Sequence, residues 1–250
     1  MTTRRDFAKT AGAALLFDIV PARALGLQGQ PPPSDTLNFG HIGIGGRGRG
    51  FLRPEANLGQ KVQASANLGG DGTRYLRPAR SMALCDIDVK RLDEAATKVG
   101  GRPKLYKDFR RLLEDREVDA VFIAAPDHWH ALMTILACQA GKDVYCEKPA
   151  CNTVEEGRAM VRAAERYGRV VQIGSQGRSQ LNAWHAAKYI RNGQLGTVRK
   201  VACWHYASPA GDWTPDEEPP PGIDYDAWVG PARWTPYNKR RTHGSFRWMI

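Results

Sequence analysis

Several common sequence signals are missing from this chain. No uninterrupted apolar run reaches about 18 residues, which excludes a membrane-spanning helix in the mature protein. The five cysteines are odd in number and include no C-x-x-C pair, so neither a disulfide framework nor a zinc site is expected. There is no internal repeat, which excludes a solenoid. What is present is ordinary globular composition, 42% hydrophobic and 25% charged over 250 residues, enough for one large domain or two modest ones.

The net charge of +10 raises the question of a nucleic-acid partner. The basic residues are scattered along the chain apart from Lys239-Arg240-Arg241, and no nucleic-acid-binding motif accompanies them. We therefore interpret them as a solvated surface. No nucleic-acid partner is expected.

The first 24 residues are typical of a targeting segment. Arg4 and Arg5 precede a mildly apolar run from Ala11 to Val20, and Ala22-Arg23-Ala24 forms a small-x-small cleavage site. This pattern predicts export to the periplasm through the twin-arginine route, which carries proteins that fold, and can load a cofactor, before export. An amphipathic N-terminal helix is the alternative. Residues 25–36 contain three consecutive prolines and are expected to be a linker.

Strands and helices alternate between residues 37 and 174. Apolar runs predict strands at 37–44, 80–85, 104–106, 118–125, 143–146 and 169–173. Helices are expected over 88–99, 108–113, 128–140 and 153–167. Asp127 is expected to cap the third helix, and Thr153 and Glu156 to form a capping box on the fourth. This order predicts the α/β class with a Rossmann doubly wound parallel sheet, and residues 53–80 are expected to form an inserted surface loop.

The pattern changes after Gly174. Residues 178–192 predict a long helix, residues 197–206 alternate as a strand, and the remainder is rich in tryptophan and proline. We expect residues 175–250 to begin a second, α+β domain with a mostly antiparallel sheet.

A glycine-rich loop follows the first expected strand. Gly43, Gly45 and Gly48 match G-x-G-x-x-G, whose glycines allow a tight turn, close approach of backbone to a pyrophosphate, and packing of a helix on the strand. Because the motif stands directly after an apolar strand, it predicts a dinucleotide site in preference to a simple glycine turn. Gly46 and Arg47 of the same loop are also expected to contact the cofactor.

Asp86 ends the second expected strand, where an acidic side chain accepts hydrogen bonds from the adenosine ribose. It lies 43 residues after Gly43 instead of roughly 20, and the inserted loop accounts for the excess. The alternative is a helix N-cap without a ligand. An acid at this position favours NAD, although Arg47 and Arg49 could receive the 2′-phosphate of NADP.

Three further motifs occur at strand ends: Ala124-Ala125-Pro126-Asp127-His128-Trp129-His130, Glu147-Lys148-Pro149 and Gly174-Ser175-Gln176-Gly177-Arg178. Together with the glycine loop, they resemble the Gfo/Idh/MocA family of NAD(P)-dependent oxidoreductases, many of which act on sugars and cyclitols. The resemblance covers about residues 37 to 250. It implies hydride transfer between a nicotinamide cofactor and a small sugar-like substrate. The cofactor is NAD or NADP, with NAD favoured. Family members often pair through the second sheet, which implies a homo-oligomer for the full-length form.

The resemblance also implies roles for individual residues. Lys148 would be the catalytic residue, since it would hydrogen-bond the substrate hydroxyl and its charge would favour the developing alkoxide. Glu147 would lie at the same edge of the cofactor cleft, and Gln176 would contact the nicotinamide ribose or amide. The residues implied to line the nicotinamide side of the cleft are Ala125, Pro126, Trp129 and His130. No metal is expected, because His128 and His130 stand two apart on a helix and do not face one another.

The sequence departs from the family in one respect. Family enzymes carry an Asp-x-x-x-His pair in the second domain, where the histidine is the general acid or base and the aspartate orients it. No such pair follows the motifs above, so we expect it beyond residue 250 and interpret the second domain as incomplete. Two alternatives to a simple dehydrogenase therefore stay open. One is an NAD-dependent glycosidase that works by transient oxidation and elimination, and the other is a truncated nucleotide-binding remnant without turnover.

Overall fold

The computed structural model describes residues 36–53, 79–204 and 214–242. The chain divides into two units, Met1–Thr36 and Leu37–Ile250, and every described helix and strand belongs to the second. The predicted twin-arginine segment, nearly all of the predicted linker and most of the predicted inserted loop lie outside the described residues.

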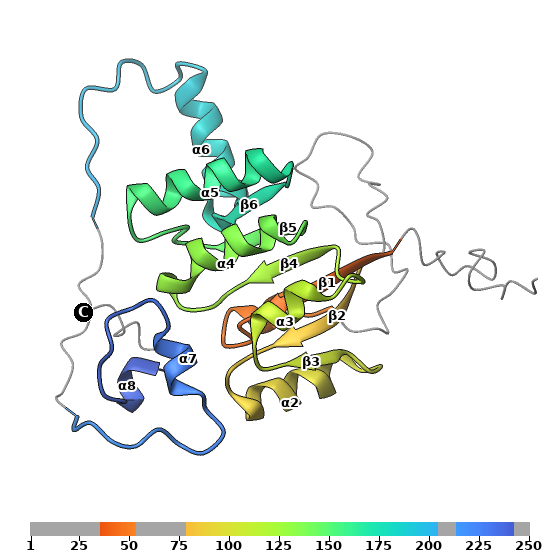
Figure 1. Cartoon of the computed structure of the whole chain (residues 1–250). Coiled ribbons are helices and arrows are strands. Elements are labelled where there is room, and N and C mark those ends of the chain that lie inside the picture. Colours follow the sequence, from red (N-terminus) through yellow and green to blue (C-terminus); the bar gives the residue numbers. More distant parts are fainter. Residues whose placement is uncertain (1–35, 54–78, 205–213, 243–250) are drawn as a thin grey trace, which may run out of the picture. The chain divides into compact units, whose positions relative to one another are not determined.

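Six parallel strands form the sheet of this unit (Figure 1). The strands are β1 (Leu37–Ile42), β2 (Ala79–Cys85), β3 (Lys104–Tyr106), β4 (Ala120–Ile123), β5 (Asp143–Glu147) and β6 (Val171–Gly174). Their order is β3-β2-β1-β4-β5-β6, and every neighbouring pair is parallel. The winding reverses between β1 and β4, and ligands of such sheets bind at that point, outside the carboxyl ends of the strands. The predicted doubly wound α/β sheet is confirmed.

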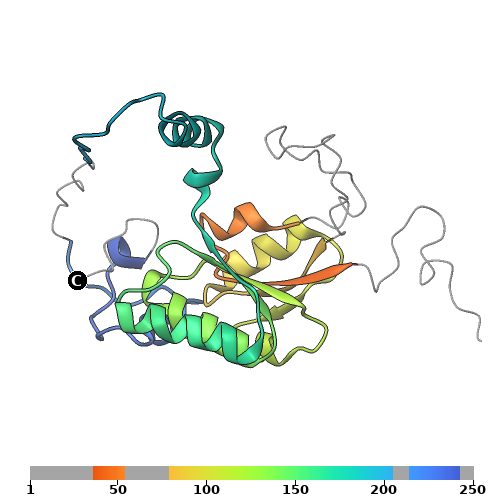
Figure 2. The ribbon, with the colours of Figure 1, turned by 90° about the horizontal axis from the view of Figure 1, so that it is seen from above.

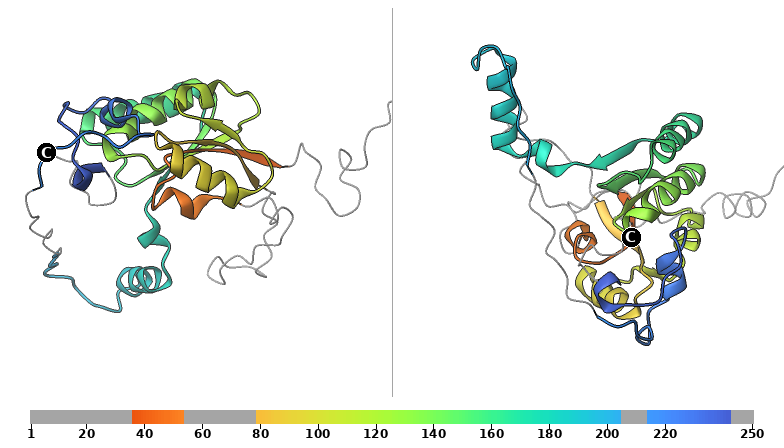
Figure 3. Two further views of the ribbon diagram at one scale, coloured as in Figure 1. Left: turned by 90° about the horizontal axis from the view of Figure 1, so that it is seen from below. Right: turned by 90° about the vertical axis from the view of Figure 1, so that its left-hand side faces the viewer.

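Helices cover both faces of the sheet (Figures 2 and 3). On one face lie α3 (Phe109–Glu114), α4 (Asp127–Gln139) and α5 (Val154–Tyr167), and on the other lie α2 (Val89–Val99) and the 3-10 turn η3 (Gly48–Phe51). The core under the first face includes Val121 and Ile123 of β4. On the second face, Leu84 of β2 packs with Leu92 and Val99 of α2. Cover on both sides explains why the β4 sequence is a nearly unbroken apolar run.

Side chains cap three of these helices at their starts. Asp88 caps α2, Asp108 caps α3, and Thr153 with Glu156 forms the predicted capping box of α5. The predicted cap of α4 by Asp127 is wrong, because Asp127 is already the first helical residue. The residue before it, Pro126, has the extended backbone of an N-cap, and the Asp127 carboxylate lies in the first turn, where the helix dipole favours negative charge.

The described residues after Gly174 contain no further strand. A 3-10 turn, η5 (Gln176–Ser179), leads into α6 (Leu181–Arg191), which covers most of the predicted helix. The strand predicted over 197–206 is wrong for residues 197–204, which are irregular and exposed. A strand needs a hydrogen-bonded neighbour, and no described segment pairs with these residues. The last elements are α7 (Tyr225–Val229) and α8 (Lys239–Thr242).

Candidate active site

A cavity of about 880 Å³ lies at the carboxyl ends of the strands. Segments that follow β1, β2, β4 and β5 form one side, and residues from the 224–242 region form another. Most of the predicted site residues line it, namely Gly43, Gly45, Gly46, Arg47, Asp86, Ala125, Pro126, Trp129, His130, Glu147 and Lys148. Gly48 and Gln176 are the two predicted residues outside this lining.

The glycine loop leaves no room for side chains at two of its positions. Gly43 has a φ of +81°, and a Cβ there would stand 2.7 Å from the backbone of Ala124. A Cβ on Gly48 would stand 2.0 Å from the carbonyl oxygen of Gly43. Gly46, by contrast, has no atom within 4 Å of its Cβ position and lines the cavity. The loop thus presents open backbone, which fits the approach of a pyrophosphate.

The segment directly after the loop is the single 3-10 turn η3, and the structure describes the chain from there as far as residue 53. Gly48 has a structural place here, since it begins that turn and is buried against Gly43. The close contact explains the need for glycine without any contact to a ligand.

Asp86 lies buried at the end of β2, on the cavity wall. Its two carboxylate oxygens accept hydrogen bonds from the backbone N–H of Ile44, at 2.6 Å, and of Asp88, at 2.9 Å. Burial raises the pKa of Asp86, and these two N–H groups together with the Arg91 charge oppose that rise. The N-cap alternative for Asp86 is wrong, because the cap of α2 is Asp88.

Both arginines that could receive an NADP phosphate are in ion pairs. Arg47 Nε lies 2.8 Å from Glu147 Oε1, and its guanidinium also lies over the ring of Phe51. Arg49 pairs with Glu94 of α2. With these two cations engaged and a carboxylate on the wall, the adenosine end of the cavity has the features of an NAD site.

Glu147, at the end of β5, is hydrogen-bonded both to the glycine loop and to the segment after β6. It is 4% exposed and accepts hydrogen bonds from Arg47 Nε and from Gln176 Nε2. Gln176 also donates to the hydroxyl of Tyr145, at 3.2 Å. Gln176 is thus directed toward Glu147, and the structure does not bring it to the cavity lining. Lys148, the next residue, is exposed and lines the cavity.

His130 fixes the backbone around Lys148. Its Nδ1 lies 2.6 Å from the carbonyl oxygen of Pro149, and its Nε2 lies 2.8 Å from that of Ala125. The ring is 1% exposed and connects the segment after β4 with the segment after β5. His130 therefore holds together two stretches of the cavity wall. Trp129 is also engaged, since its indole N–H donates to the carbonyl oxygens of Ala227 and Trp228.

Comparison with known proteins identifies the family. A family model described as "Oxidoreductase family, NAD-binding Rossmann fold" matches residues 37–175, more than half of the chain. The chain belongs to the Gfo/Idh/MocA family. A second model, "Oxidoreductase family, C-terminal alpha/beta domain", matches residues 182–249. The predicted family and the predicted NAD-binding class of fold are confirmed.

Individual relatives are dehydrogenases. Over 172 residues the chain is 31% identical to the inositol 2-dehydrogenase of Salmonella typhimurium, covering 68% of this chain and 46% of that protein. It is 36% identical over 124 residues to the D-apiose dehydrogenase of Paraburkholderia graminis, covering 50% of this chain and 33% of that protein. A solved levoglucosan dehydrogenase, in complex with NADH and levoglucosan, is 28% identical with a TM-score of 0.53, over 64% of this chain and 40% of that one. The chain spans about half the length of the curated relatives it matches.

The sequence analysis missed several cavity residues of this family member. Arg91 lines the cavity, and its Nη1 lies 2.8 Å from the position a Cβ on Gly45 would take. Arg91 stands three residues after Asp88 and forms an ion pair with it. This helical spacing could have indicated that Arg91 lies beside the end of β2. Lys107 and Arg110 also line the cavity, as do Asp224, Asp226, Ala227, Trp228 and Gly230. No local pattern connects these last residues with the glycine loop, because the contact is made only by the fold.

Three other kinds of feature bear on function in the described residues: metal-binding clusters, cysteines and membrane-spanning helices. The described residues contain no cluster of three metal-binding side chains. All five cysteines are free, and burial raises the pKa of Cys146 to about 12, as expected for a thiol that packs as a small apolar residue. Among the described helices, none has the length and apolar character needed to cross a membrane.

Proposed function

We propose that this chain is the cofactor-binding part of an NAD-dependent dehydrogenase that oxidises a hydroxyl group of a sugar or cyclitol, or reduces the matching carbonyl. The cavity carries this proposal, because it brings the open glycine loop, the buried Asp86 carboxylate and Lys148 together at one edge of the sheet. Relatives named for inositol, D-apiose and levoglucosan support the substrate class.

The chain's own residues supply binding and charge. Bound NAD would supply a hydride acceptor at its nicotinamide ring. The backbone of Gly45 and Gly46 lines the cavity and would face the pyrophosphate, and Asp86 would accept hydrogen bonds from the ribose. Lys148 would donate a hydrogen bond to the substrate oxygen and stabilise the negative charge that develops there, while the histidine of the family's Asp-x-x-x-His pair would take the hydroxyl proton. His130 contacts the carbonyl oxygens of Pro149, next to that lysine, and of Ala125 on the segment after β4.

Formation of NADH tests the proposal. The full-length protein, including the C-terminal domain that carries the family's general acid or base, is incubated with NAD and, in turn, inositol, D-apiose and levoglucosan, and absorbance of NADH is followed. NADH should accumulate with at least one polyol, and Lys148→Met should lower the rate about a hundredfold or more, since one charge-stabilising donor is lost. Lys188→Met, on the exposed helix α6, is the matched control and should leave the rate unchanged.

Two results would contradict the dehydrogenase. Cleavage of a glycoside without net NADH formation would favour the glycosidase that works by transient oxidation. Binding of NAD without turnover of any polyol or glycoside would favour a nucleotide-binding remnant.

We also propose that the protein is exported through the twin-arginine route to the periplasm. Arg4 and Arg5, the apolar run after them and the Ala22-Arg23-Ala24 site support this. Residues 1–36 fused to a folded fluorescent reporter should carry it to the periplasm, and replacing both arginines by lysine should retain it in the cytoplasm. Export of the double variant at an unchanged level would argue for another route.

We further propose that the full-length protein is a homo-oligomer. The resemblance supports this, since family members often pair through the sheet of their second domain, and a model of that domain matches residues 182–249. Sedimentation of the purified protein should give a mass at least twice that of one chain, and a monomer at micromolar concentration would contradict it.

A further inference from the structure

One stretch of the cavity wall lies outside the glycine loop and the three strand-end motifs. Residues 222–230, which we name the strap, include α7 and lie far in sequence from the glycine loop. Five of its residues line the same cavity as that loop: Asp224, Asp226, Ala227, Trp228 and Gly230. We propose that the strap forms the outer wall of the dinucleotide site and slows the release of bound NAD. This inference rests on the proposed NAD site.

The strap is attached at one end beside Asp86. The backbone N–H of Val89 donates to the carbonyl oxygen of Gly222, at 3.1 Å, and the N–H of Asp224 donates to that of Ile87, at 3.2 Å. Between these bonds, Asp88 and Ile223 form an antiparallel bridge. The attachment is thus a short piece of sheet-like pairing, located where the adenosine ribose is expected.

The other end is attached beside the segment after β4. The indole N–H of Trp129 lies 3.1 Å from the carbonyl oxygens of both Ala227 and Trp228. His128 Nε2 lies 2.9 Å from the same Trp228 oxygen, so this nitrogen carries the proton and donates. Gly230 rests against the indole so closely that a Cβ there would stand 1.9 Å from a ring carbon. This end lies where the nicotinamide is expected.

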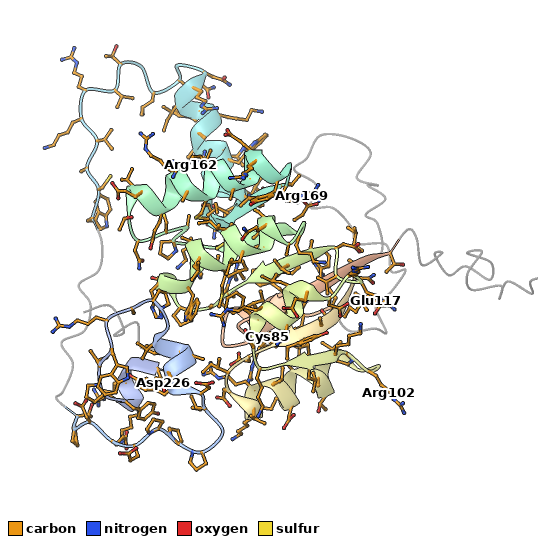
Figure 4. The ribbon with its side chains drawn as sticks, in the orientation of Figure 1. Cys85, Arg102, Glu117, Arg162, Arg169 and Asp226 are labelled. Carbon is orange, nitrogen blue, oxygen red and sulfur yellow. The ribbon has the colours of Figure 1, made fainter. Side chains whose placement is uncertain are left out.

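Between its two ends the strap is packed in its own right. Tyr225 and Trp228 stack with ring centroids 5.7 Å apart, and Tyr237 lies edge-on to Tyr225. The hydroxyl of Tyr225 donates to the carbonyl oxygens of Thr235 and Pro236. Figures 1 and 4 show α7, which carries Asp226, next to α8 and beside the ends to which the strand arrows point. A packed segment of this kind moves as a unit, so it opens only when an attachment is broken.

A dinucleotide that extends from Asp86 to Lys148 therefore lies between the glycine loop and the strap. Its departure requires loss of the bonds at one end. At each end one donor can be removed singly, which weakens the attachment: the indole N–H of Trp129 at one end and the backbone N–H of Val89 at the other. Weakening either end of the strap is thus an independent test of whether the strap slows the release of NAD.

The experiment measures the dissociation rate of NADH from the full chain by fluorescence after rapid mixing with excess NAD. Trp129→Phe keeps an aromatic ring and loses the donor, and Trp184→Phe on the exposed α6 is its control. Val89→Pro removes one N–H at the first position of α2, where proline is tolerated, and Val154→Pro at the first position of α5 is its control. Each strap variant loses one or two hydrogen bonds, so NADH should dissociate from it about three to ten times faster than from the unaltered chain. The control variants should release NADH at the rate of the unaltered chain.

Different results separate this inference from the proposed function. Dissociation rates of both strap variants equal to those of their controls would overturn the strap while leaving NAD binding intact. An increase for Trp129→Phe alone would overturn it as well, because it would indicate a direct contact of the ring with the cofactor. Failure of the unaltered chain to bind NADH would overturn the proposed function, and the strap with it.

Discussion

Helices form in both of two regions, residues 37–174 and residues 177–204, but only those of the first region bury side chains. In the first region, α4 has eight buried residues and packs against α5 and the sheet. In the second, α6 forms as the spacing predicts and has no buried residue, and Leu181, Trp184 and Ile190 are 41–48% exposed. A helix of this length without buried contacts is marginal in water, so the stability of α6 depends on what the rest of the fold brings against it.

The comparison extends to the helix starts. The N-cap of α5 is a capping box, in which Thr153 and Glu156 each bond the other's backbone. The N-cap of α6 is Gln180, with no side-chain bond. The first region therefore combines end signals with buried contacts, and the second has neither among its described residues. Paired substitutions of one residue type in the two regions can test this difference.

The largest difference is expected for leucine. Leu112 of α3 is fully buried, and Leu181 of α6 is 46% exposed. Leu112→Ala should lower the free energy of unfolding by about 2–5 kcal/mol, because it leaves a cavity in the core, whereas Leu181→Ala should change it by less than about 0.5 kcal/mol. Urea denaturation measures both. Equal losses would show that α6 is packed as tightly as α3.

Glycine gives the next contrast. A Cβ on Gly48 would stand 2.0 Å from the carbonyl oxygen of Gly43, whereas Gly177 in η5 has no atom within 4 Å of that position. Gly48→Ala should displace the loop and weaken NADH binding about tenfold to a hundredfold, since overpacking here cannot be relieved by a side chain. Gly177→Ala should bind NADH normally in calorimetry. Normal binding by both variants would contradict the rigid loop.

Asp86 predicts a pH dependence whose sign follows from burial. Because burial raises its pKa, NADH affinity should fall with decreasing pH earlier than for an ordinary aspartate, as the carboxylate that accepts ribose hydrogen bonds is lost. The sign for stability is opposite, since the ionised buried group costs folding free energy and protonation removes that cost. Asp86→Asn should weaken NADH binding about tenfold and flatten the pH profile of affinity.

The control for that experiment is Asp93→Asn on the exposed face of α2, which should keep both the affinity and its pH profile. A profile unaltered by Asp86→Asn would assign the titration to another group.

The smallest effect is expected at the caps. Thr153→Ala removes the capping box of α5 and should cost about 1 kcal/mol of unfolding free energy. Gln180→Ala removes a residue whose side chain makes no cap bond, so its thermal denaturation should match the unaltered chain. A similar loss at both positions would mean that the cap bond itself contributes little.

The sheet and the loop could be predicted because their signals are local. Strands buried on both faces are apolar throughout, and the G-x-G-x-x-G spacing follows from steric needs at Gly43 and Gly48 that the structure shows directly. Asp86 was found in the same way, from its place at the end of β2. Its hydrogen bonds to Ile44 and Asp88 were not predictable, since they depend on how loop and strand are brought together.

The remaining differences come from tertiary structure. Residues 197–204 include β-branched residues such as Val198 and Val201 that favour strands, but a strand forms only beside a hydrogen-bonded partner. Gln176 lies at the expected edge of the sheet, yet Glu147 and Tyr145 bind its amide. The contact of the strap with the cavity was not predicted, because its hydrogen bonds go to backbone carbonyl oxygens, and every residue type has one.

The central claim is that the cavity at the strand ends binds NAD. A fluorescence titration of the unaltered full chain with NADH, and in parallel with NADPH, tests it most directly. The account predicts saturable binding of one NADH per chain and weaker binding of NADPH, because the Asp86 carboxylate lies on the wall while Arg47 and Arg49 are engaged in ion pairs. Tighter binding of NADPH, or no saturable binding of either nucleotide, would contradict it.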